Sequence, residues 1–537
     1  MKKSKRFTAS LLALQMAVGL LLSGCGAAPS NSSSGANKVA MNEEGLPIVD
    51  EKVTFHMVAP IDPAQAPFEE MAFFKELEER TNVHIEWELI PSADFAQKKN
   101  LILAGKDYPD AFFMGIDEND IERYAPQGVF LELDDLIAQY CPRLTKIFED
   151  YPIYKSVCTA TNGKVYGLAN ANAGSHFYNV DQMFINKAWL DKLGLPIPET
   201  TDDLYNTLKA FKTQDPNGNG LNDEIPFSFI FNHQINSIHS LFGSFGRPDF
   251  TRANDVCSHF VVEDGKVVFT ADKPEFKAAV EFYHKFFEEG LFDAEGFTQD
   301  AKQYRAKGVT EDETLGSFMA FTALEIVGPD RVDDYVPLGP LKGPDGDQSW
   351  ISFERINGGV RGPTFAITKN CENPEILMRW IDEFYDVKTS IEANFGPVRE
   401  TADGKYETTE PEGMTLDEYR FKECPMWAPS AVFEDYYGKY IEPTAPDKLK
   451  ADIREEYYQD YQVPSMPFIT WTQEEAAWNA STGTDIMNYV NDNLAKWLLN
   501  GGIEEEWDDY VAQLNAMGLE QHIQVMQTAY DRQMSVS

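Results

Sequence analysis

VTFHMVA (Val53–Ala59), VHIEWELI (Val83–Ile90) and DAFFM (Asp110–Met114) are three short apolar runs that lie close together in the sequence and decide its fold class. They are rich in β-branched and aromatic residues, as buried strands are. Two amphipathic helical patterns separate them, at Phe68–Arg80 and at Phe95–Ala104. Strands that alternate with helices at this spacing form βαβ units. We therefore predict an α/β fold with a parallel sheet that is covered by helices.

The loops that follow these strands are candidates for ligand binding. In open α/β sheets, ligands bind beyond the carboxyl ends of the strands. Those ends fall at Pro60–Pro63, Pro91–Asp94 and Gly115–Asp117. Asp62 and Asp117 are the polar groups that we expect to line a crevice there.

The length and the charge of the chain limit what it can be. It has 537 residues, and single hydrophobic cores stop growing at about 250–300 residues, so we expect at least two domains. It carries 46 Lys and Arg against 87 Asp and Glu, which gives a net charge of −41. This charge argues against a nucleic-acid partner, because phosphate binding requires a basic face.

The N-terminus is typical of an exported lipoprotein. Residues 1–24 combine a basic start with the apolar run Leu11–Leu22, which is too short to span a membrane. The next residues, up to Cys25, resemble the bacterial lipobox, so we predict cleavage before Cys25 and lipidation of its thiol. Residues 25–51 begin with a run rich in Gly, Ser and Asn and would tether the body to the extracellular face of the cytoplasmic membrane. The alternative is an ordinary secretory signal with an incidental cysteine.

The segment DPNGNGLNDE, from Asp215 to Glu224, has the spacing of a calcium-binding loop. Side chains with oxygen atoms stand at loop positions 1, 3, 5 and 9, a glycine stands at position 6, and a carbonyl is available at position 7, as in an EF-hand. Position 12 departs from this pattern because it is Pro226, and Glu224 at position 10 could take its role. The ligands of a structural Ca²⁺ would then be Asp215, Asn217, Asn219, the carbonyl of Leu221, Asp223 and Glu224. The alternative is a polar turn that caps the preceding helix.

Catalytic signatures are missing from the sequence. None of its eight His residues lies in an HExxH pattern, and neither a Gly-x-Ser-x-Gly elbow nor a Walker loop occurs. Acidic residues are so numerous that a pair at the spacing of a glycosidase site is expected by chance. We therefore predict that the protein is not an enzyme.

A longer stretch carries a family resemblance. The segment FYNVDQMFINKAWLDKLGLPIPETTDDLYNTLKAFKTQDPNGNGLNDEIPF resembles the signature region of bacterial extracellular solute-binding proteins of ABC importers, in carbohydrate-binding family 1. It is most similar to the large lipoproteins of Gram-positive bacteria that take up complex sugars. Similar stretches continue in order along the mature chain, at 104–110, 286–300, 335–346, 365–375 and 529–532. Alginate-oligosaccharide binders of this family carry a similar calcium loop, which implies the same six calcium ligands.

The resemblance implies a two-lobe periplasmic-binding-protein-like α/β fold, with three hinge crossings and a cleft between the lobes. By pattern, the crossings should fall near Tyr178–Ile185, Gly316–Phe321 and Gly362–Thr368. Lobe one would then combine residues 52–180 with 316–365, and lobe two would combine 181–315 with 366–537. Closure of the lobes on a ligand would present a surface to the permease.

A sugar offers apolar C–H faces and a rim of hydroxyl groups, so its sites pair flat aromatic rings with polar side chains. Three tryptophans lie outside periodic helices and are our candidates for stacking: Trp350, Trp427 and Trp471. The polar candidates are Glu354 and Arg355 beside Trp350, Asn170, Asn172 and His176 before the first crossing, and Asn232 and His233 after a short apolar run.

Three functions remain open on the sequence alone. The first is a lipoprotein that captures an oligosaccharide or another sugar for an ABC importer. Its partners would be the sugar, the permease subunits and, through the lipid anchor, the membrane; we expect a monomer. The second is an oligopeptide-binding lipoprotein with the same architecture, and the third is a surface-anchored glycosidase.

The lipid anchor gives a direct prediction. If Cys25 is lipidated, the protein expressed with its native N-terminus should partition into the detergent phase, and Cys25→Ser should release it or leave the signal uncleaved. Equal recovery of both forms in the soluble fraction would contradict lipidation.

Overall fold

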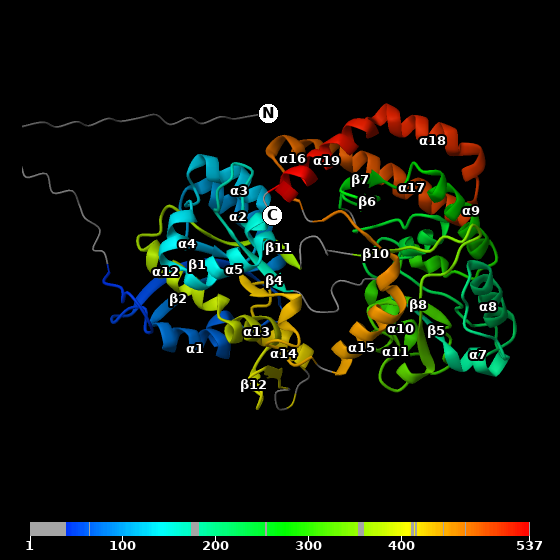
Figure 1. The fold of residues 1–537 in the computed structure, drawn as a ribbon, viewed down its shortest axis with the longest axis horizontal. Helices are drawn as coiled ribbons and strands as arrows, with labels where there is room; N and C mark the ends of the chain where they lie inside the picture. Colours follow the sequence, from blue (N-terminus) through cyan, green and yellow to red (C-terminus); the bar gives the residue numbers. More distant parts are fainter. Residues whose placement is uncertain are drawn as a thin grey trace, which may run out of the picture. The chain divides into compact units, whose positions relative to one another are not determined.

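The computed structural model describes residues 39–535, apart from residues 64, 173–181, 253–254, 353–358, 410–412, 414–415, 444 and 468 (Figure 1). The signal peptide, Cys25 and most of the tether lie outside the described residues. Within the described part, none of the helices combines the length and the apolar character needed to cross a bilayer.

One six-stranded sheet forms the centre of the first lobe. Its strand order is β14-β4-β11-β3-β1-β2, and β1 pairs in parallel with both β2 and β3, as the sequence predicts. β11 runs antiparallel to both of its neighbours, β3 and β4. The strands are β1 (Val53–Ile61), β2 (Val83–Pro91), β3 (Ala111–Phe113), β4 (Leu168–Asn172), β11 (Val360–Ile367) and β14 (Ser430–Val432).

Helices cover this sheet, and a small hairpin is attached to it. The helices are α1 (Ala72–Thr81), α2 (Ser92–Gly105), α3 (Glu118–Tyr124), α4 (Asp134–Tyr140), α5 (Pro142–Asp150), α6 (Pro152–Cys158), α12 (Pro374–Asp382), α13 (Val387–Phe395) and α14 (Leu416–Glu423). The hairpin pairs β12 (Val398–Glu400) with β13 (Tyr406–Thr408). In Figure 1 the yellow helices α12 and α13 lie against the blue and cyan elements, although they come much later in the sequence.

The second lobe is more helical. It contains the sheet β8-β5-β9 and two smaller pairs, β6-β7 and β10-β15. The strands are β5 (Gln182–Asn186), β6 (Phe260–Glu263), β7 (Lys266–Phe269), β8 (Ser317–Ala320), β9 (Tyr335–Leu338), β10 (Trp350–Ser352) and β15 (Gln462–Pro464). The helices are α7 (Lys187–Leu193), α8 (Thr201–Thr213), α9 (Pro274–Glu288), α10 (Ala301–Gly308), α11 (Ala323–Val327), α15 (Ala445–Ile453), α16 (Gln473–Trp478), α17 (Thr484–Asn500), α18 (Ile503–Met517) and α19 (Leu519–Ser535).

Local capping explains where several of these helices begin. α8 starts at Thr200, whose hydroxyl accepts the N–H of Asp203 while the Asp203 carboxylate accepts the N–H of Thr200. α3 starts with the same reciprocal arrangement between Asp117 and Asp120. Such capping boxes satisfy backbone donors that the first helical turn leaves free.

Two large hydrophobic cores divide the molecule. The first draws its residues from Ile48–Ala171 and from Val360–Ile441, and the second from Met183–Trp350 and from Ile453–Tyr530. The two cores share no residue, as expected for a fold of two lobes.

The predicted boundaries of the lobes need correction. Ser317–Ala320 pairs with β5 in the second lobe, so Gly316–Phe321 is not a crossing and residues 316–352 do not belong to lobe one. Val360–Ile367 lies inside the first sheet, so Gly362–Thr368 is not a crossing either. Helices α12 and α13 pack in the first core, which assigns most of 366–441 to lobe one.

Over the described range 39–535, the chain passes between the two lobes three times, and only the first passage overlaps a predicted crossing. It leaves the first sheet at Asn172 and enters the second at Gln182, in the region of the first predicted crossing. It returns between Ser352 and Val360, and it passes to the second core again between Ile441 and Ile453.

Candidate functional site

A rigid loop ends β3 at one edge of the first sheet. Met114 and Gly115 have φ angles of 60° and 71°, and a Cβ on Gly115 would lie 2.3 Å from the Phe95 ring, so only glycine fits there. The buried Lys99 forms an ion pair with Asp120 and donates to the carbonyl of Gly115 at 3.0 Å. Asp117, a predicted ligand-binding residue, is therefore held in place as the cap of α3.

Glu118 is the next residue, and it lies between the lobes. A Cβ on Gly362 of β11 would stand 2.8 Å from its carboxylate, so the side chain reaches across to the backbone of β11. Burial, together with the charges of Asp117, Asp255 and Asp120, raises the pKa of Glu118 to about 7. Since Asp255 belongs to the second lobe, the charge of a second-lobe carboxylate acts on Glu118.

An arginine covers one predicted stacking residue. The guanidinium carbon of Arg361 lies 4.4 Å from the ring centroid of Trp427, a cation–π contact. The Trp427 side chain is 41% exposed. Arg361 also pairs with Asn170 in the ladder between β11 and β4, so the Trp427 ring lies beside a predicted polar residue.

Asn170 and Asn172 are buried at this end of β4 with only part of their hydrogen-bonding capacity used. The Asn170 amide donates to the carbonyl of Ala428 and to the hydroxyl of Ser430, and the Asn172 amide donates to Asn394 at 3.0 Å. Within the described part of the chain, their side-chain oxygens and the Nε atom of Arg361 have no hydrogen-bond partner. A buried polar atom without a partner costs about 1–3 kcal/mol, so these atoms favour a ligand that supplies hydroxyl groups.

The structure corrects the assignment of Trp350 as a stacking platform. This side chain is 1% exposed and belongs to the second core, where its ring lies 5.3 Å from that of Tyr458. Its face is covered by protein. Trp471 is partly buried against the same core.

Three further predicted residues, all described, have other surroundings in the structure. Asp62 is exposed, and its backbone N–H donates to Gln65. Asn232 is also exposed and accepts a hydrogen bond from Thr251 at 3.2 Å. His233 is half-buried in the second lobe, and burial lowers its pKa. His176, Glu354 and Arg355 lie outside the described residues.

Sequence reasoning missed Glu118 and Arg361. Glu118 directly follows a predicted loop residue and could have been found by extending that loop. Arg361 could not be found from its neighbours in the sequence. It is identified by its contact with Trp427, which belongs to a distant segment that meets β11 only in the fold.

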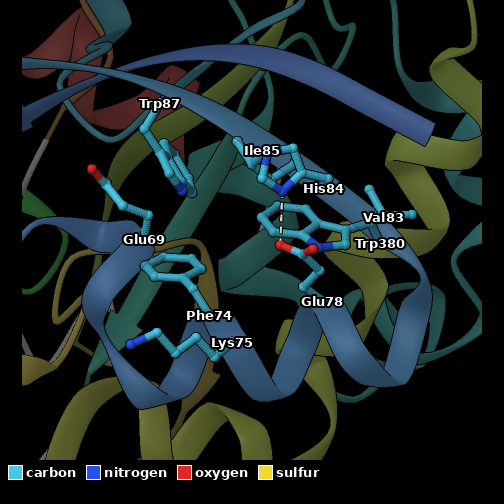
Figure 2. A pocket seen from close by; sticks show the side chains of 9 residues that line it. All are labelled: Glu69, Phe74, Lys75, Glu78, Val83, His84, Ile85, Trp87 and Trp380. Atoms are coloured by element: carbon cyan, nitrogen blue, oxygen red, sulfur yellow. Dashed lines mark hydrogen bonds and ion pairs between the residues drawn. The ribbon is translucent and has the colours of Figure 1, made fainter. Parts of the chain in front are cut away.

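A small pocket on the first lobe is a poor candidate for an oligosaccharide site (Figure 2). It lies between α1 and β2, and its volume is about 120 Å³. The rings of Phe74, Trp87 and Trp380 line it, together with the ion pair of Glu78 and His84 at 2.8 Å. None of the predicted ligand-binding residues lines it, and small-ligand pockets usually have about 300–1,000 Å³.

The predicted calcium ligands converge in the loop after α8. The two carboxylate oxygens of Asp215 accept the N–H groups of Gly218 and Gly220, and the amide nitrogens of Asn217 and Asn219 lie 3.0–3.3 Å from the Asp223 carboxylate. One oxygen of Glu224 is buried with no hydrogen-bond partner among the described residues.

These side chains fit a hard cation. Burial raises the pKa of Glu224, and Asp223 and Asp215 raise it further, as expected where a positive charge would relieve the repulsion. Among the described residues, no group of three or more Asp, Glu, His or Cys side chains is already arranged to hold a metal ion. The two asparagine oxygens and the carbonyl of Leu221 would have to complete the set.

Comparison with known proteins gives one family and a well-matched relative. The family described as bacterial extracellular solute-binding protein matches residues 61–389. The fructooligosaccharide ABC transporter substrate-binding protein FusA of Streptococcus pneumoniae serotype 4 is 34% identical over 99% of each chain.

Solved structures of FusA agree with the fold. The complex of FusA with kestose matches with a TM-score of 0.77 and 33% identity, over 90% of this chain and 100% of that one. An EF-hand mutant of FusA in complex with fructo-nystose matches over the same shares with a TM-score of 0.78 and 33% identity.

The raised pKa of Glu118 makes a prediction about pH. The ordinary pKa is 4.5 and the folded value is about 7, so between these values the folded state binds more protons than the unfolded state. Stability should therefore fall as the pH rises from 4.5 through 7. Because Glu118→Gln cannot ionise, its melting temperature relative to the parent should rise between pH 5 and pH 8. Glu69→Gln, at an exposed site, is the control; a constant difference between Glu118→Gln and the parent would contradict the assignment.

Proposed function

Because the chain belongs to the family of bacterial extracellular solute-binding proteins, we propose that it captures an oligosaccharide between its two lobes and delivers it to an ABC importer. Fructo-oligosaccharides are the first candidates, since FusA is named for them and its structures hold kestose and fructo-nystose. The protein would bind the sugar without changing it.

The cluster around Trp427 carries this proposal. It combines an exposed indole ring with buried amide oxygens on Asn170 and Asn172 and a donor on Arg361 that lack partners among the described residues. A sugar ring can cover the indole with its C–H face while its hydroxyl groups reach those atoms. An apolar ligand would leave the polar atoms unsatisfied.

Glu118 and Asp255 are placed to sense closure of the lobes. They belong to different lobes and repel each other when both are ionised. A ligand hydroxyl between them would donate to a carboxylate and offset this repulsion. Glu118 would therefore bind sugar from the first lobe, next to the indole of Trp427 and the guanidinium of Arg361.

The location and the partners complete the proposal. A lipid on Cys25 would anchor the chain at the extracellular face of the cytoplasmic membrane, where the closed form would meet the permease subunits as a monomer. A calcium ion held by the loop Asp215–Glu224 would fix the turn after α8. An ion there would be structural, since groups of the protein itself would supply its ligands.

Binding can be tested by calorimetry with kestose and nystose, beside a panel of other oligosaccharides and short peptides. We expect saturable binding of an oligosaccharide, a change in tryptophan fluorescence and an unchanged sugar at the end. Trp427→Ala should weaken the affinity by about thirtyfold, since a buried stacked aromatic contributes about 2 kcal/mol.

Two results would contradict this assignment. Trp427→Phe keeps a ring face and is the matched control, so equal losses in both variants would argue against stacking. Binding of peptides without binding of any oligosaccharide would replace the proposed ligand class.

Calcium can be tested by thermal unfolding. An ion that binds only the folded state stabilises it by about 2.7 kcal/mol at a hundredfold excess over Kd, so chelation should lower the melting temperature and added Ca²⁺ should restore it. Asp215→Ala should abolish this response, whereas Asp345→Ala, in an exposed turn, should retain it. If elemental analysis finds no calcium and chelation has no effect, the loop is only a turn.

A further inference from the structure

A second concave site lies on the second lobe alone. It has a volume of about 440 Å³, and all of the residues that line it come from the second lobe. Two aromatic residues, Tyr457 and Tyr461, line it together with Ile197 and the end of β9. None of the residues proposed to bind sugar between the lobes belongs to it.

A short π-helix, Arg454–Tyr458, directs two neighbouring tyrosines to different environments. Tyr458 enters the core, where its hydroxyl donates to the carbonyl of Leu338 at 2.7 Å and accepts the N–H of Met183 at 3.0 Å. Tyr457 remains partly exposed and lines the pocket. π-Helices are rare and often occur at functional sites.

A glycine allows Tyr457 to approach the wall of the pocket. A Cβ on Gly339 would lie 3.3 Å from the carbonyl oxygen of Tyr457 and 3.6 Å from its ring. A Cβ there would be tight against the carbonyl oxygen of Tyr457 and in ordinary contact with its ring. The Tyr457 segment therefore packs closely against the backbone of Gly339.

Polar groups of both kinds surround the two rings. Glu199, Glu456 and Lys342 are exposed at the pocket, and the side chain of Gln348 donates to the carbonyl of Pro340 at 3.0 Å, which leaves its amide oxygen available as an acceptor. The pocket thus offers apolar ring surface together with donors and acceptors. Its volume falls within the range of about 300–1,000 Å³ that is usual for small-ligand sites.

We propose that this pocket, defined by Tyr457, Tyr461, Glu199, Glu456 and Gln348, is a second carbohydrate-binding site that takes one or two sugar units on the outside of the second lobe. Neutral sugar rings pack on tyrosine faces and bond to carboxylates and amides through their hydroxyl groups. Because only one lobe contacts this ligand, it is bound with lower affinity than a ligand enclosed between two lobes.

The pocket is also connected to the segments that join the lobes. Leu338, in its wall, pairs with Met183 near the start of β5, directly after the first passage of the chain from lobe one. Tyr461 directly precedes β15, which pairs with β10, the last strand before the second passage. A sugar bound here would therefore lie next to strands that begin or end at two of the segments connecting the lobes.

The test is a calorimetric titration of the protein with nystose, continued to millimolar concentration. The parent should show a tight event and a second, weaker one. Tyr461→Ala should retain the tight event and weaken the second by at least about tenfold. Tyr461→Phe keeps the ring and should retain both. Trp427→Ala should weaken the tight event by about thirtyfold and leave the second unchanged.

Glu456→Ala is a second variant that should not affect folding, because its exposed side chain can be removed without opening the core. It should weaken the second event and leave the melting temperature unchanged. Absence of the second event in the parent, or its persistence unchanged in Tyr461→Ala and Glu456→Ala, would overturn the proposal. If the parent shows the weaker event but no tight one, the proposed function between the lobes is contradicted and this second site is still supported.

Discussion

Two hydrophobic cores share no residue, and the lobes meet where the chain passes between them and where α3 and α6 of the first lobe contact α16 and α19 of the second. One of these contacts is buried: the Ser156 hydroxyl donates to the carbonyl of Gln533 at 2.9 Å. Close-packed interiors deform little, so each lobe moves as a unit. A ligand that contacts both lobes would therefore favour rotation of one lobe against the other, as we propose for the sugar.

This constraint also explains where polar atoms are left without partners. In a lobe that packs by itself, Asn170 and Asn172 would be expected to satisfy both ends of their amides, yet their oxygens find no partner among the described residues. The same end of the sheet carries Arg361 over Trp427 and the raised pKa of Glu118. The unpartnered amide oxygens and the buried carboxyl group of Glu118 cost stability in the free protein, and a bound sugar would reduce that cost.

The sequence was informative where structure depends on local pattern. β1, β2 and β3 could be predicted from short apolar runs, and the exposed Trp427 was recognised from its irregular surroundings. Lobe boundaries depend on pairing between segments that are distant in the sequence. The sequence therefore places β8 in the wrong lobe, because its pairing with β5 is visible only in the fold. The prediction that Trp350 stacks on a sugar is wrong for the same reason. Its polar neighbours in the sequence suggest exposure, whereas Tyr458, from a distant segment, packs against it in the core.

The central claim is that an oligosaccharide closes the two lobes. Small-angle X-ray scattering of a truncated form without residues 1–25 measures this directly. It is recorded with and without an oligosaccharide, at saturation established by calorimetry. The account predicts a smaller radius of gyration in the saturated protein and no further change when more sugar is added. Scattering curves that coincide at saturation would contradict capture by closure.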